Sequence, residues 1–465
     1  METETFPESI LKACDIRGVY PEPLGLDQAL QIGQAVGTLV KIEGKGNIKV
    51  VVGGDIRESS EDLKEQLLAG LKGCGMKVID AGLVSTPLLA YATRFTDASV
   101  GVMVTASHNP SQYNGFKFFH ADGPAPIPWV ERLYKVLRAG EFKCGAGVSE
   151  KKDFLPDYRT ALVRAVASNL RHFSLVADLG NGAAAVATPS VLEALGCDFH
   201  LLHERMDARY PGRGPDSSHP PALRELGEAV KKHKAALGAA FDGDGDRVAF
   251  VDDKGIPLPN DAALCIFARH YLAKHMGGKV VYDAKSFDLV EALVAEAGGE
   301  AVLERSGHVF IHTRIRDEKA VLGGEASGHF FLPGPYPGDA LFACLKFMEI
   351  LKALGQPLSK IHQTFPPRVS THDVKVKIDL PNLPALLAAL DKRAKDMGGK
   401  VSRVDGVRAV FPEGWGIARA SVTEPVLSIR IEAVHRRALR KIVSQWFEGQ
   451  DEPLQALLDR IGQGD

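Results

Sequence analysis

The pattern of apolar and polar positions predicts the same order of strand, helix and strand three times along the chain. The first copy begins at 49–55 with a buried strand that runs into a Gly-rich turn, continues as a helical pattern and ends in a short strand at 78–79. The second copy begins at 174–178 and the third at 279–283. Glycine follows each helical pattern, which is the usual way for a helix to stop, so each copy predicts a βαβ unit. The three helices are predicted to end at Leu71, Leu195 and Glu296.

Each unit is followed by one more strand that runs into a polar loop. Strand 99–104 leads to TASHNP, strand 236–241 leads to DGDGDR, and strand 320–323 leads to GEASGH. Ligands in open α/β sheets bind beyond the ends of the strands. Three related domains could therefore direct three different loops to one site, although three unrelated βαβ units would show the same pattern.

The pattern changes after Pro366 and Pro367. An alternating stretch at 371–378, strands at 407–411 and 426–432, and helices at 383–397 and 437–446 follow, the last of these being the final helix expected. This order predicts an α+β domain with a mostly antiparallel sheet. The fold class is therefore three similar α/β domains, with mixed sheets flanked by helices, plus a smaller C-terminal α+β domain. The predicted domains are 1–150, 151–254, 255–367 and 368–465, joined by linkers at 145–152, 253–261 and 365–371.

Composition narrows the classes of partner. The chain has 465 residues, 45% hydrophobic and 25% charged, which is ordinary for a globular protein, and its net charge is −2. That charge gives no reason to expect nucleic acid or an anionic membrane as a partner. The first ten residues have no apolar core, and no apolar run approaches the ~20 residues of a membrane span. Six scattered cysteines without a CxxC pair favour reduced thiols, so we expect a cytoplasmic protein.

The run DGDGDR at 242–247 places three carboxylates at alternate positions between two apolar strands. Two unit charges about 4 Å apart repel by ~4 kcal/mol at an effective dielectric of 20, so three pairs cost roughly 12 kcal/mol. Few domains have that much stability to spare. Carboxylates favour a hard cation, Mg²⁺ before Ca²⁺ or Mn²⁺. A solvated acidic turn is the alternative, whereas Arg247 at the glycine position excludes an EF-hand loop. The predicted metal ligands are Asp242, Asp244 and Asp246.

Ser107 lies in the loop TASHNP, directly after a buried strand. Such a loop can be a plain turn, and Pro110 excludes glycosylation of Asn109. A hydrolase dyad with His108 is disfavoured, because neighbouring side chains diverge and no nucleophile elbow is present. What remains is a serine that carries a phosphoryl group. Phosphoserine adds about −1.5 to −2 charge, and its oxygen could complete the metal shell, where the cation would polarise the phosphorus.

Four motifs, TASHNP, DGDGDR, GEASGH and RASVTEP (419–425), occur in this order over essentially the whole chain. Together they closely resemble the α-D-phosphohexomutase superfamily, and most of all its phosphomannomutase/phosphoglucomutase branch. The resemblance implies four domains around a central cleft and reversible phosphoryl transfer between the 1- and 6-positions of a hexose phosphate. It implies that phosphorylated Ser107 and the three aspartates hold Mg²⁺. A hexose 1,6-bisphosphate would be the intermediate, turning around before its other phosphoryl group returns to Ser107.

The resemblance also implies roles for further residues. Around the reacting phosphoryl group it places Arg17, His108 and Lys117. Lys117 follows an apparent turn at Asn114-Gly115, which would put it on a strand beyond the serine loop, although an exposed hairpin lysine is the alternative. For the sugar and its distal phosphate it implies Arg247, Lys285, His308, Glu325, Ser327, His329, Arg419, Ser421 and Thr423. The two histidines are polar candidates only, since a lone histidine is more often structural.

Three positions depart from the family's usual residues. Cys14 stands where tyrosine is common, Gly54 where arginine is frequent, and Val422 where glycine or asparagine is usual. None of the three removes the nucleophile or the metal ligands, so activity is still expected and only affinity is in question.

Other functions stay open at this point. A haloacid-dehalogenase-like phosphatase would use Asp242 as nucleophile, but TASHNP and RASVTEP would then have no role. A non-catalytic sugar-phosphate-binding protein would need no Ser107. Within the family a phosphoglucosamine mutase is the nearest rival, and the sequence leaves mannose against glucose undecided. The expected partners are small hexose phosphates, and we expect a monomer or a weak dimer.

Overall fold

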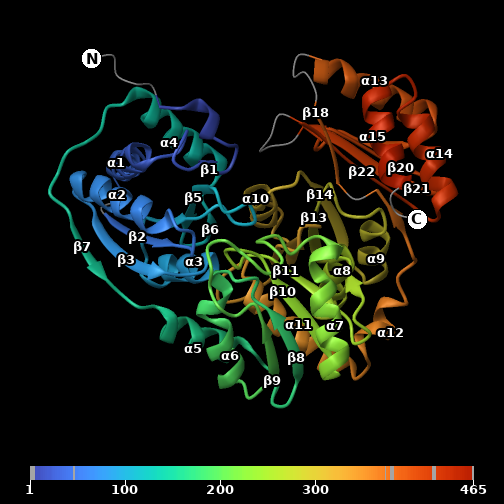
Figure 1. The fold of residues 1–465 in the computed structure, drawn as a ribbon, viewed down its shortest axis with the longest axis horizontal. Helices are drawn as coiled ribbons and strands as arrows, with labels where there is room; N and C mark the ends of the chain where they lie inside the picture. Colours follow the sequence, from blue (N-terminus) through green and yellow to red (C-terminus); the bar gives the residue numbers. More distant parts are fainter. Residues whose placement is uncertain (1–5, 45–47, 372, 378–381, 421–425, 463–465) are drawn as a thin grey trace. The chain divides into compact units, whose positions relative to one another are not determined.

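The structure is a computed structural model that describes residues 6–44, 48–371, 373–377, 382–420 and 426–462. Within these ranges the strands form four sheets, and the chain folds as three α/β domains followed by a C-terminal α+β domain, as predicted (Figure 1). Residues up to 263 together with 327–362 form one compact unit, and residues 264–326 together with 363–465 form a second. The boundaries between the four domains stay a prediction.

The first domain is built on a sheet with the strand order β1-β5-β4-β2-β3-β7. Its central strands are parallel and buried on both faces, which explains the unbroken apolar run at 50–54. The strands are β1 (Ile16–Val19), β2 (Lys49–Gly54), β3 (Lys77–Leu83), β4 (Val100–Val104), β5 (Tyr113–His120), β6 (Gly123–Pro124) and β7 (Val148–Lys151). The helices are η1 (Glu8–Ile10), α1 (Leu26–Glu43), α2 (Ser60–Gly73), α3 (Thr86–Phe95) and α4 (Ile127–Ala139). β7 lies inside a predicted linker and pairs with β3.

Two glycines allow α1 and α2 to pack at very short range. A Cβ atom at Gly33 would lie 2.3 Å from the carbonyl oxygen of Leu67, and one at Gly70 would lie 2.2 Å from that of Leu30. Both contacts are with backbone atoms, and moving the backbone would cost considerable free energy. Only glycine fits where these two helices cross.

The second domain has the strand order β12-β11-β10-β8-β9. Its strands are β8 (Ser174–Asp178), β9 (Asp198–Leu202), β10 (Leu237–Phe241), β11 (Val248–Val251) and β12 (Pro257–Leu258). Its helical segments are α5 (Leu155–Ala165), η2 (Ala183–Val186), α6 (Thr188–Ala194), η3 (Pro220–Leu223) and α7 (Arg224–His233). β10 and β11 form an antiparallel pair in which Phe241 faces Val248, so 242–247 is the loop between two buried strands, as predicted.

The helix predicted to end at Leu195 is α6, whose last residue is Ala194. A 3₁₀ turn, η2, comes first, and α6 begins only at Thr188 with Pro189 in its first turn. Proline lacks the N–H that a helix interior needs and is tolerated in the first turn. The proline therefore fixes where the α-helix starts.

The third α/β domain has β13 (Lys279–Asp283) parallel to both β14 (Glu300–Glu304) and β15 (Leu322–Gly324). Its helices are α8 (Asn260–Leu272), α9 (Val290–Glu296), which ends where predicted, and α10 (His308–Glu318). Further along the chain, in the compact unit that contains residues 327–362, come β16 (Phe330–Phe331), α11 (Ala340–Leu354) and α12 (Leu358–His362).

The C-terminal domain has an antiparallel sheet with the order β17-β22-β21-β20-β19, and β18 also pairs with β22. Its strands are β17 (Val369–Ser370), β18 (Val374–Lys377), β19 (Lys400–Ser402), β20 (Val407–Phe411), β21 (Gly414–Ala420) and β22 (Val426–Ala433). Its helices are α13 (Leu383–Asp396), α14 (Arg436–Trp446) and α15 (Asp451–Gly462).

The sequence analysis missed β21 and α15, besides the short strands β17 and β19. β21 contains two glycines, which mask its alternating pattern, yet its Trp415 and Ile417 are fully buried. The expectation that the helix at 437–446 is the last one is also wrong. α15 follows it and packs Leu457 and Ile461 into the same apolar core as Trp446.

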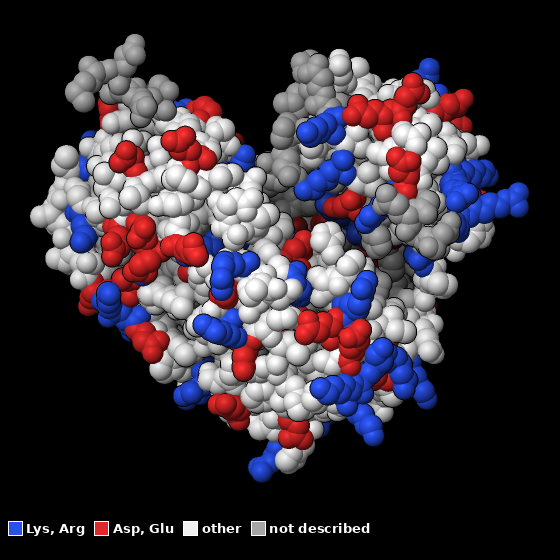
Figure 2. All heavy atoms as spheres, viewed as in Figure 1, with Lys and Arg blue, Asp and Glu red and all other residues white. Residues whose placement is uncertain are grey.

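Charged side chains of both signs are interspersed over the face shown in Figure 2, in keeping with the small net charge of −2. Of the helices in the described ranges, none has both the length and the apolar character needed to cross a lipid bilayer.

The α1–α2 crossing yields a stability prediction. We expect Gly70→Ala to lower the free energy of unfolding by about 1–3 kcal/mol, because the new methyl group overlaps backbone atoms of α1. Thermal unfolding followed by circular dichroism measures the change. Gly73→Ala on the same helix is the control, since a Cβ there meets nothing within 4 Å. Equal losses in the two variants would contradict this packing argument.

Candidate active site at the serine and acidic loops

Ser107 lies in a tightly bonded loop that follows β4. Its backbone is left-handed, with φ of +51°, and its side chain is fully buried. The Ser107 N–H donates to Thr105 Oγ1 at 2.9 Å, and that hydroxyl donates to Asp55 Oδ2 at 2.7 Å. The loop is therefore anchored to residues that follow the neighbouring strand β2.

The sequence analysis missed Arg57, whose side chain contacts the serine loop. It follows β2, and its guanidinium donates to the carbonyl oxygens of Ser107 at 2.8 Å and Asn109 at 2.7 Å. A signal was present in the sequence. Residues 55–57 read Asp-Ile-Arg, as do residues 15–17, and both segments adjoin a buried strand.

The acidic loop meets Ser107 directly. Ser107 Oγ donates to Asp242 Oδ2 at 2.9 Å, which confirms that the two predicted loops come together. The other oxygen of Asp242 accepts from the backbone N–H groups of Gly245, Asp246 and Arg247, each at 3.1 Å. Burial, together with the charges of Asp244 and Asp246, raises the pKa of Asp242 well above its ordinary value.

Lys117 on β5 bridges the other two aspartates. Its Nζ lies 2.6 Å from Asp244 Oδ2 and 2.6 Å from Asp246 Oδ2. Thr86 Oγ1 also donates to Asp244 Oδ2 at 2.6 Å. Burial would lower the pKa of Lys117, but the aspartates raise it above its ordinary value. Lys117 is buried, so it is not an exposed hairpin lysine.

The turn predicted at Asn114-Gly115 is wrong, because both residues lie within β5. Asn114 is buried, and its side-chain amide donates to the hydroxyls of Ser59 and Ser60. These buried partners outweigh the general preference of asparagine and glycine for turns.

The three aspartates satisfy the chemical requirements of a metal site. Each offers one carboxylate oxygen, and these oxygens lie within 4.8 Å of one another. Asp244 Oδ1 and Asp246 Oδ1 are buried and accept no hydrogen bond from any residue in the described ranges. Arg247 Nε stands farther off, 4.0 Å from Asp242 and 3.8 Å from Asp246. Buried oxygens and surplus negative charge of this kind could hold a metal ion.

Three further residues predicted for the site lie at the serine and acidic loops: Arg17, His108 and His329. Arg17 donates to Asn109 Oδ1 of the serine loop and to Asp15 Oδ2, each at 2.6 Å. His108 is half-buried, and burial together with Arg247 holds its pKa well below the ordinary value. His329 Nδ1 lies 3.9 Å from Asp246 Oδ2. Burial lowers the pKa of His329 to about 4, so its imidazole is neutral near pH 7.

Ser327 belongs to the same compact unit as these residues. The carbonyl of the adjacent Gly328 accepts from the N–H of Val248, the residue that follows the acidic loop. This bond ties the loop carrying Ser327 to the start of β11.

The remaining predicted residues lie in the second compact unit. Glu325 Oε1 accepts from the N–H of Gly307, next to His308, at 2.7 Å. Arg419 Nε lies 2.8 Å from Asp405 Oδ2, and that oxygen also accepts from the N–H of Ser306 at 3.1 Å. Asp405, which the sequence analysis missed, thus joins Arg419 to the segment that carries His308. Lys285 pairs with Asp373. Ser421, Thr423 and the departure at Val422 lie outside the described residues.

Arg213, Asp178 and His203 form a network that supports the strand end directly before the acidic loop. Arg213 donates to Asp178 Oδ2 at 2.6 Å and to the carbonyl of Phe241, which directly precedes the loop. His203 Nδ1 lies 3.0 Å from Asp178 Oδ1 and Nε2 lies 3.4 Å from Glu225. Burial alone would raise the pKa of Asp178, but these two partners hold it below the ordinary value.

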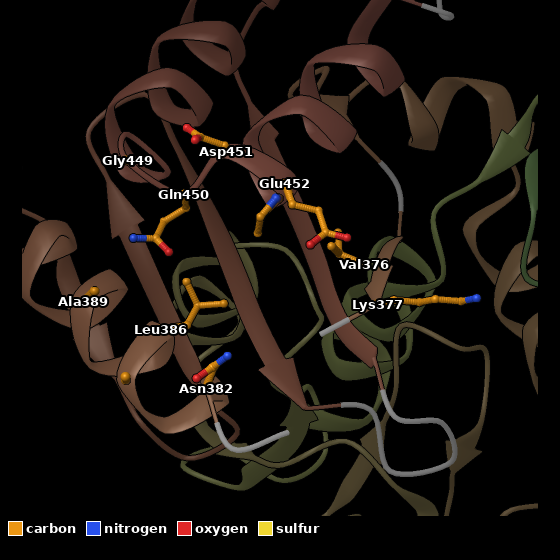
Figure 3. A pocket seen from close by; sticks show the side chains of 11 residues that line it. Val376, Lys377, Asn382, Leu386, Ala389, Gly449, Gln450, Asp451 and Glu452 are labelled. Carbon is orange, nitrogen blue, oxygen red and sulfur yellow. The ribbon is translucent and has the colours of Figure 1, made fainter. Parts of the chain in front are cut away.

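Two hollows are present in the described residues. One of about 430 Å³ lies in the C-terminal domain between α13 and the loop before α15, where Figure 3 shows Leu386, Gln450 and Glu452 around it. It contains none of the predicted site residues. Another, of about 310 Å³, is lined by Asp55, Arg57 and Glu61 beside the serine loop.

The chain matches a known protein family along most of its length. Four models of the phosphoglucomutase/phosphomannomutase family match in order: α/β/α domain I at residues 8–143, domain II at 154–255, domain III at 259–369 and the C-terminal domain at 375–448.

Individual relatives match over nearly their whole length. A phosphomannomutase/phosphoglucomutase of Pseudomonas aeruginosa is 36% identical over 94% of each chain. A phosphoglucomutase of Neisseria gonorrhoeae is 33% identical over 94% of this chain and 95% of its own. The crystal structure of a phosphoglucomutase/phosphomannomutase family protein from Burkholderia thailandensis matches with a TM-score of 0.85 and 33% identity over 98% of both chains.

The network behind the acidic loop predicts a pH-dependent contribution to stability. The hydrogen bond with Asp178 raises the pKa of His203 above its ordinary value, so the folded state binds this proton more tightly than the unfolded chain does. The resulting stability is complete below the unfolded pKa of about 6.5 and is lost as pH rises through the folded pKa. We expect His203→Gln to lower the Tm by roughly 2–4 °C at low pH, with the difference closing at alkaline pH.

Thermal melts of wild type and variant across this pH range make the measurement. His172→Gln is the control, since His172 and its partner Asp198 are both exposed and such pairs contribute little. A Tm difference for His203→Gln that is independent of pH would show that the pair acts by packing alone.

Proposed function

The chain belongs to the phosphoglucomutase/phosphomannomutase family, and we infer that it is an isomerase that moves a phosphoryl group reversibly between positions 1 and 6 of a hexose phosphate. The family models span the chain in order, and relatives with these activities cover nearly all of it. The observation that carries the chemistry is the contact of the Ser107 hydroxyl with Asp242 inside a buried, charged site.

We propose that Ser107 carries the phosphoryl group between substrates. In the first half-reaction a hydroxyl of the hexose monophosphate attacks phosphorus, the bond from phosphorus to Ser107 Oγ breaks, and the hydroxyl proton passes to a base. The product is a hexose 1,6-bisphosphate. After this intermediate turns around, Ser107 Oγ attacks its other phosphorus, the bond from that phosphorus to the sugar oxygen breaks, and the sugar oxygen takes a proton back from the base. Asp242 Oδ2, 2.9 Å from Ser107 Oγ, gives a proton to the leaving serine oxygen in the first half-reaction and accepts it again in the second.

The cations around Ser107 suit this chemistry. Lys117 lies against two of the aspartates, and Arg17 is fixed by Asn109 of the serine loop. We propose that these two side chains and His108 surround the transferring group and stabilise its charge. Mg²⁺ held by Asp242, Asp244, Asp246 and the phosphoserine would supply further positive charge and polarise the phosphorus.

Residues of the other segments would bind the rest of the substrate. Glu325 and Ser327 offer acceptors and donors to sugar hydroxyls, with Arg247, His308 and His329 as further polar groups. Arg419 would bind the phosphate that is not reacting. Its ion pair with Asp405 uses Nε, and a phosphate can be bound by the two terminal nitrogens as a planar fork. Lys285, Ser421 and Thr423 would assist.

Binding of the distal phosphate by Arg419 explains how one site accepts the bisphosphate in both orientations, because either phosphate can occupy either position. The names of the relatives favour glucose and mannose phosphates as substrates, and a hexose 1,6-bisphosphate would also act as activator. The cytoplasmic location and the monomeric or weakly dimeric state stay predictions.

Replacing the nucleophile tests the proposal. We expect Ser107→Ala to lose the single phosphoryl group that intact-mass spectrometry detects on the wild type after incubation with a hexose 1,6-bisphosphate. Turnover of glucose 1-phosphate, mannose 1-phosphate and glucosamine 1-phosphate, each measured in a coupled assay with the activator, should fall by roughly 10³-fold or more.

The wild-type values of kcat/KM rank the three sugars, and a preference for glucosamine 1-phosphate would make the chain a phosphoglucosamine mutase. Retention of the phosphoryl group by Ser107→Ala, or its release by hydroxylamine, would instead point to an aspartyl phosphate on the acidic loop.

A second substitution tests the distal phosphate site. We expect Arg419→Ala to raise KM about tenfold or more, the equivalent of a charge-assisted hydrogen bond, while Ser107 is still phosphorylated to the same extent. Steady-state kinetics and intact-mass spectrometry give the two readouts. Arg403→Ala in the same domain is the control, because Arg403 is exposed and forms its ion pair with Asp391, whereas Arg419 pairs with Asp405. An unchanged KM for Arg419→Ala would exclude this role.

A further inference from the structure

The guanidinium of Arg57 has an acceptor for every one of its five N–H groups. Nη2 donates to the carbonyls of Ser107 and Asn109, at 2.8 and 2.7 Å. Nη1 donates to the carbonyls of Pro110 and Tyr113, at 2.7 and 2.8 Å. Nε donates to Asp55 Oδ2 at 3.2 Å. The side chain is fully buried, so the backbone of residues 107–113 encloses one cation.

The conformation of Ser107 explains why such an anchor is needed. A non-glycine residue with φ of +51° is strained and persists only where its surroundings enforce it. Arg57 binds the carbonyl of Ser107 itself and those of three residues that follow. Asp55, fixed by Arg57, also accepts from Thr105 on the other side of the serine.

We propose that Arg57 is a positioning residue for phosphoryl transfer: it holds Ser107 Oγ toward the acidic loop and thereby sets the rate of the chemical step, not the affinity for the sugar phosphate. This inference rests on the function proposed above. Arg57 bonds to backbone carbonyls and to Asp55, and its side chain is buried, so a substrate need not touch it. A displacement of the nucleophile of about 1 Å is enough to reduce a rate by roughly 10²-fold.

Lysine cannot replace this arginine. An ammonium group has three donors around one nitrogen, whereas four carbonyls and one carboxylate here surround a planar fork of five. Arg57→Lys therefore keeps the positive charge but leaves buried carbonyls without donors and releases the loop. The Arg57→Lys variant therefore tests the hydrogen-bond geometry of the anchor while its positive charge is kept.

A matched control comes from the same part of the fold. Lys64 on α2 is also a buried cation, and it pairs with Asp80 at 3.3 Å and Glu61 at 2.9 Å. Lys64→Met removes a buried charge from the same domain without changing the serine loop. It reports what loss of stability alone does to turnover.

The experiment measures kcat, KM, Tm and the rate at which a hexose 1,6-bisphosphate phosphorylates Ser107. For Arg57→Lys we expect kcat and the phosphorylation rate to fall by roughly 100-fold, with KM changed less than about threefold. For Lys64→Met we expect a lower Tm with kcat within about twofold of the wild type. A rise in KM as large as the fall in kcat, or equal losses of kcat in the two variants, would overturn the proposal.

Chemical rescue adds a second test with Arg57→Gly. The hollow of about 310 Å³ beside Asp55, Arg57 and Glu61 gives a small cation a place to enter. Added guanidinium should raise kcat in this variant and leave the kcat of Lys64→Met unchanged. Failure of both Arg57 variants to fold, while Lys64→Met folds, would assign Arg57 a purely structural role and also overturn the proposal. Failure of the proposed function is distinct, since the wild type itself would then show neither turnover nor phosphorylated Ser107.

Discussion

The concentration of negative charge on one buried loop is the constraint on which the rest of this structure depends. Asp242, Asp244 and Asp246 are almost completely buried, and their ligand oxygens lie within 4.8 Å of one another. Each pair of unit charges at about 4 Å repels by ~4 kcal/mol at an effective dielectric of 20. Two sets of donors offset this repulsion. Three backbone N–H groups donate to Asp242, and the ammonium of Lys117 pairs with Asp244 and Asp246. The loop can exist only where a sheet and a buried cation hold it, and it is well suited to bind a further cation.

Two separate supports hold the two reacting loops. The acidic loop is fixed at its start by Arg213, through the carbonyl of Phe241 and the carboxylate of Asp178. The serine loop is fixed by Arg57, through four of its own carbonyls. In both cases a buried arginine binds backbone and one aspartate at the end of a parallel strand. The positions of the functional side chains are therefore set by the strand ends and by the contacts of these two arginines, and not by the loop sequences alone.

Local patterns in the sequence predicted the parts of this arrangement that local rules determine. The βαβ units and the strand–loop–strand around DGDGDR are confirmed. The contact of Ser107 with Asp242 is not local; it was expected from the charge of a phosphoserine beside a metal site and from the resemblance to a family. The errors arose where distant contacts decide. Asn114-Gly115 looks like a turn but is a buried part of β5, and two glycines hide β21, whose Trp415 is fully buried. Arg57 and Asp405 were missed because their partners are up to about a hundred residues away in the chain. No spacing rule indicates such contacts, although the repeated Asp-Ile-Arg at 15–17 and 55–57 was a usable signal.

The proposed reaction itself explains why the nucleophile should be held by the protein and not by the substrate. Ser107 must meet phosphorus twice in one turnover, and between these events the bisphosphate is reversed, so that a different sugar carbon lies next to the serine. Any contact that oriented Ser107 through the sugar would be correct in one half-reaction and wrong in the other. Contacts from Arg57 to backbone carbonyls and from Thr105 to the Ser107 N–H are the same in both halves. A substrate-independent anchor beneath the serine is therefore what a reversible transfer between two positions of one sugar requires.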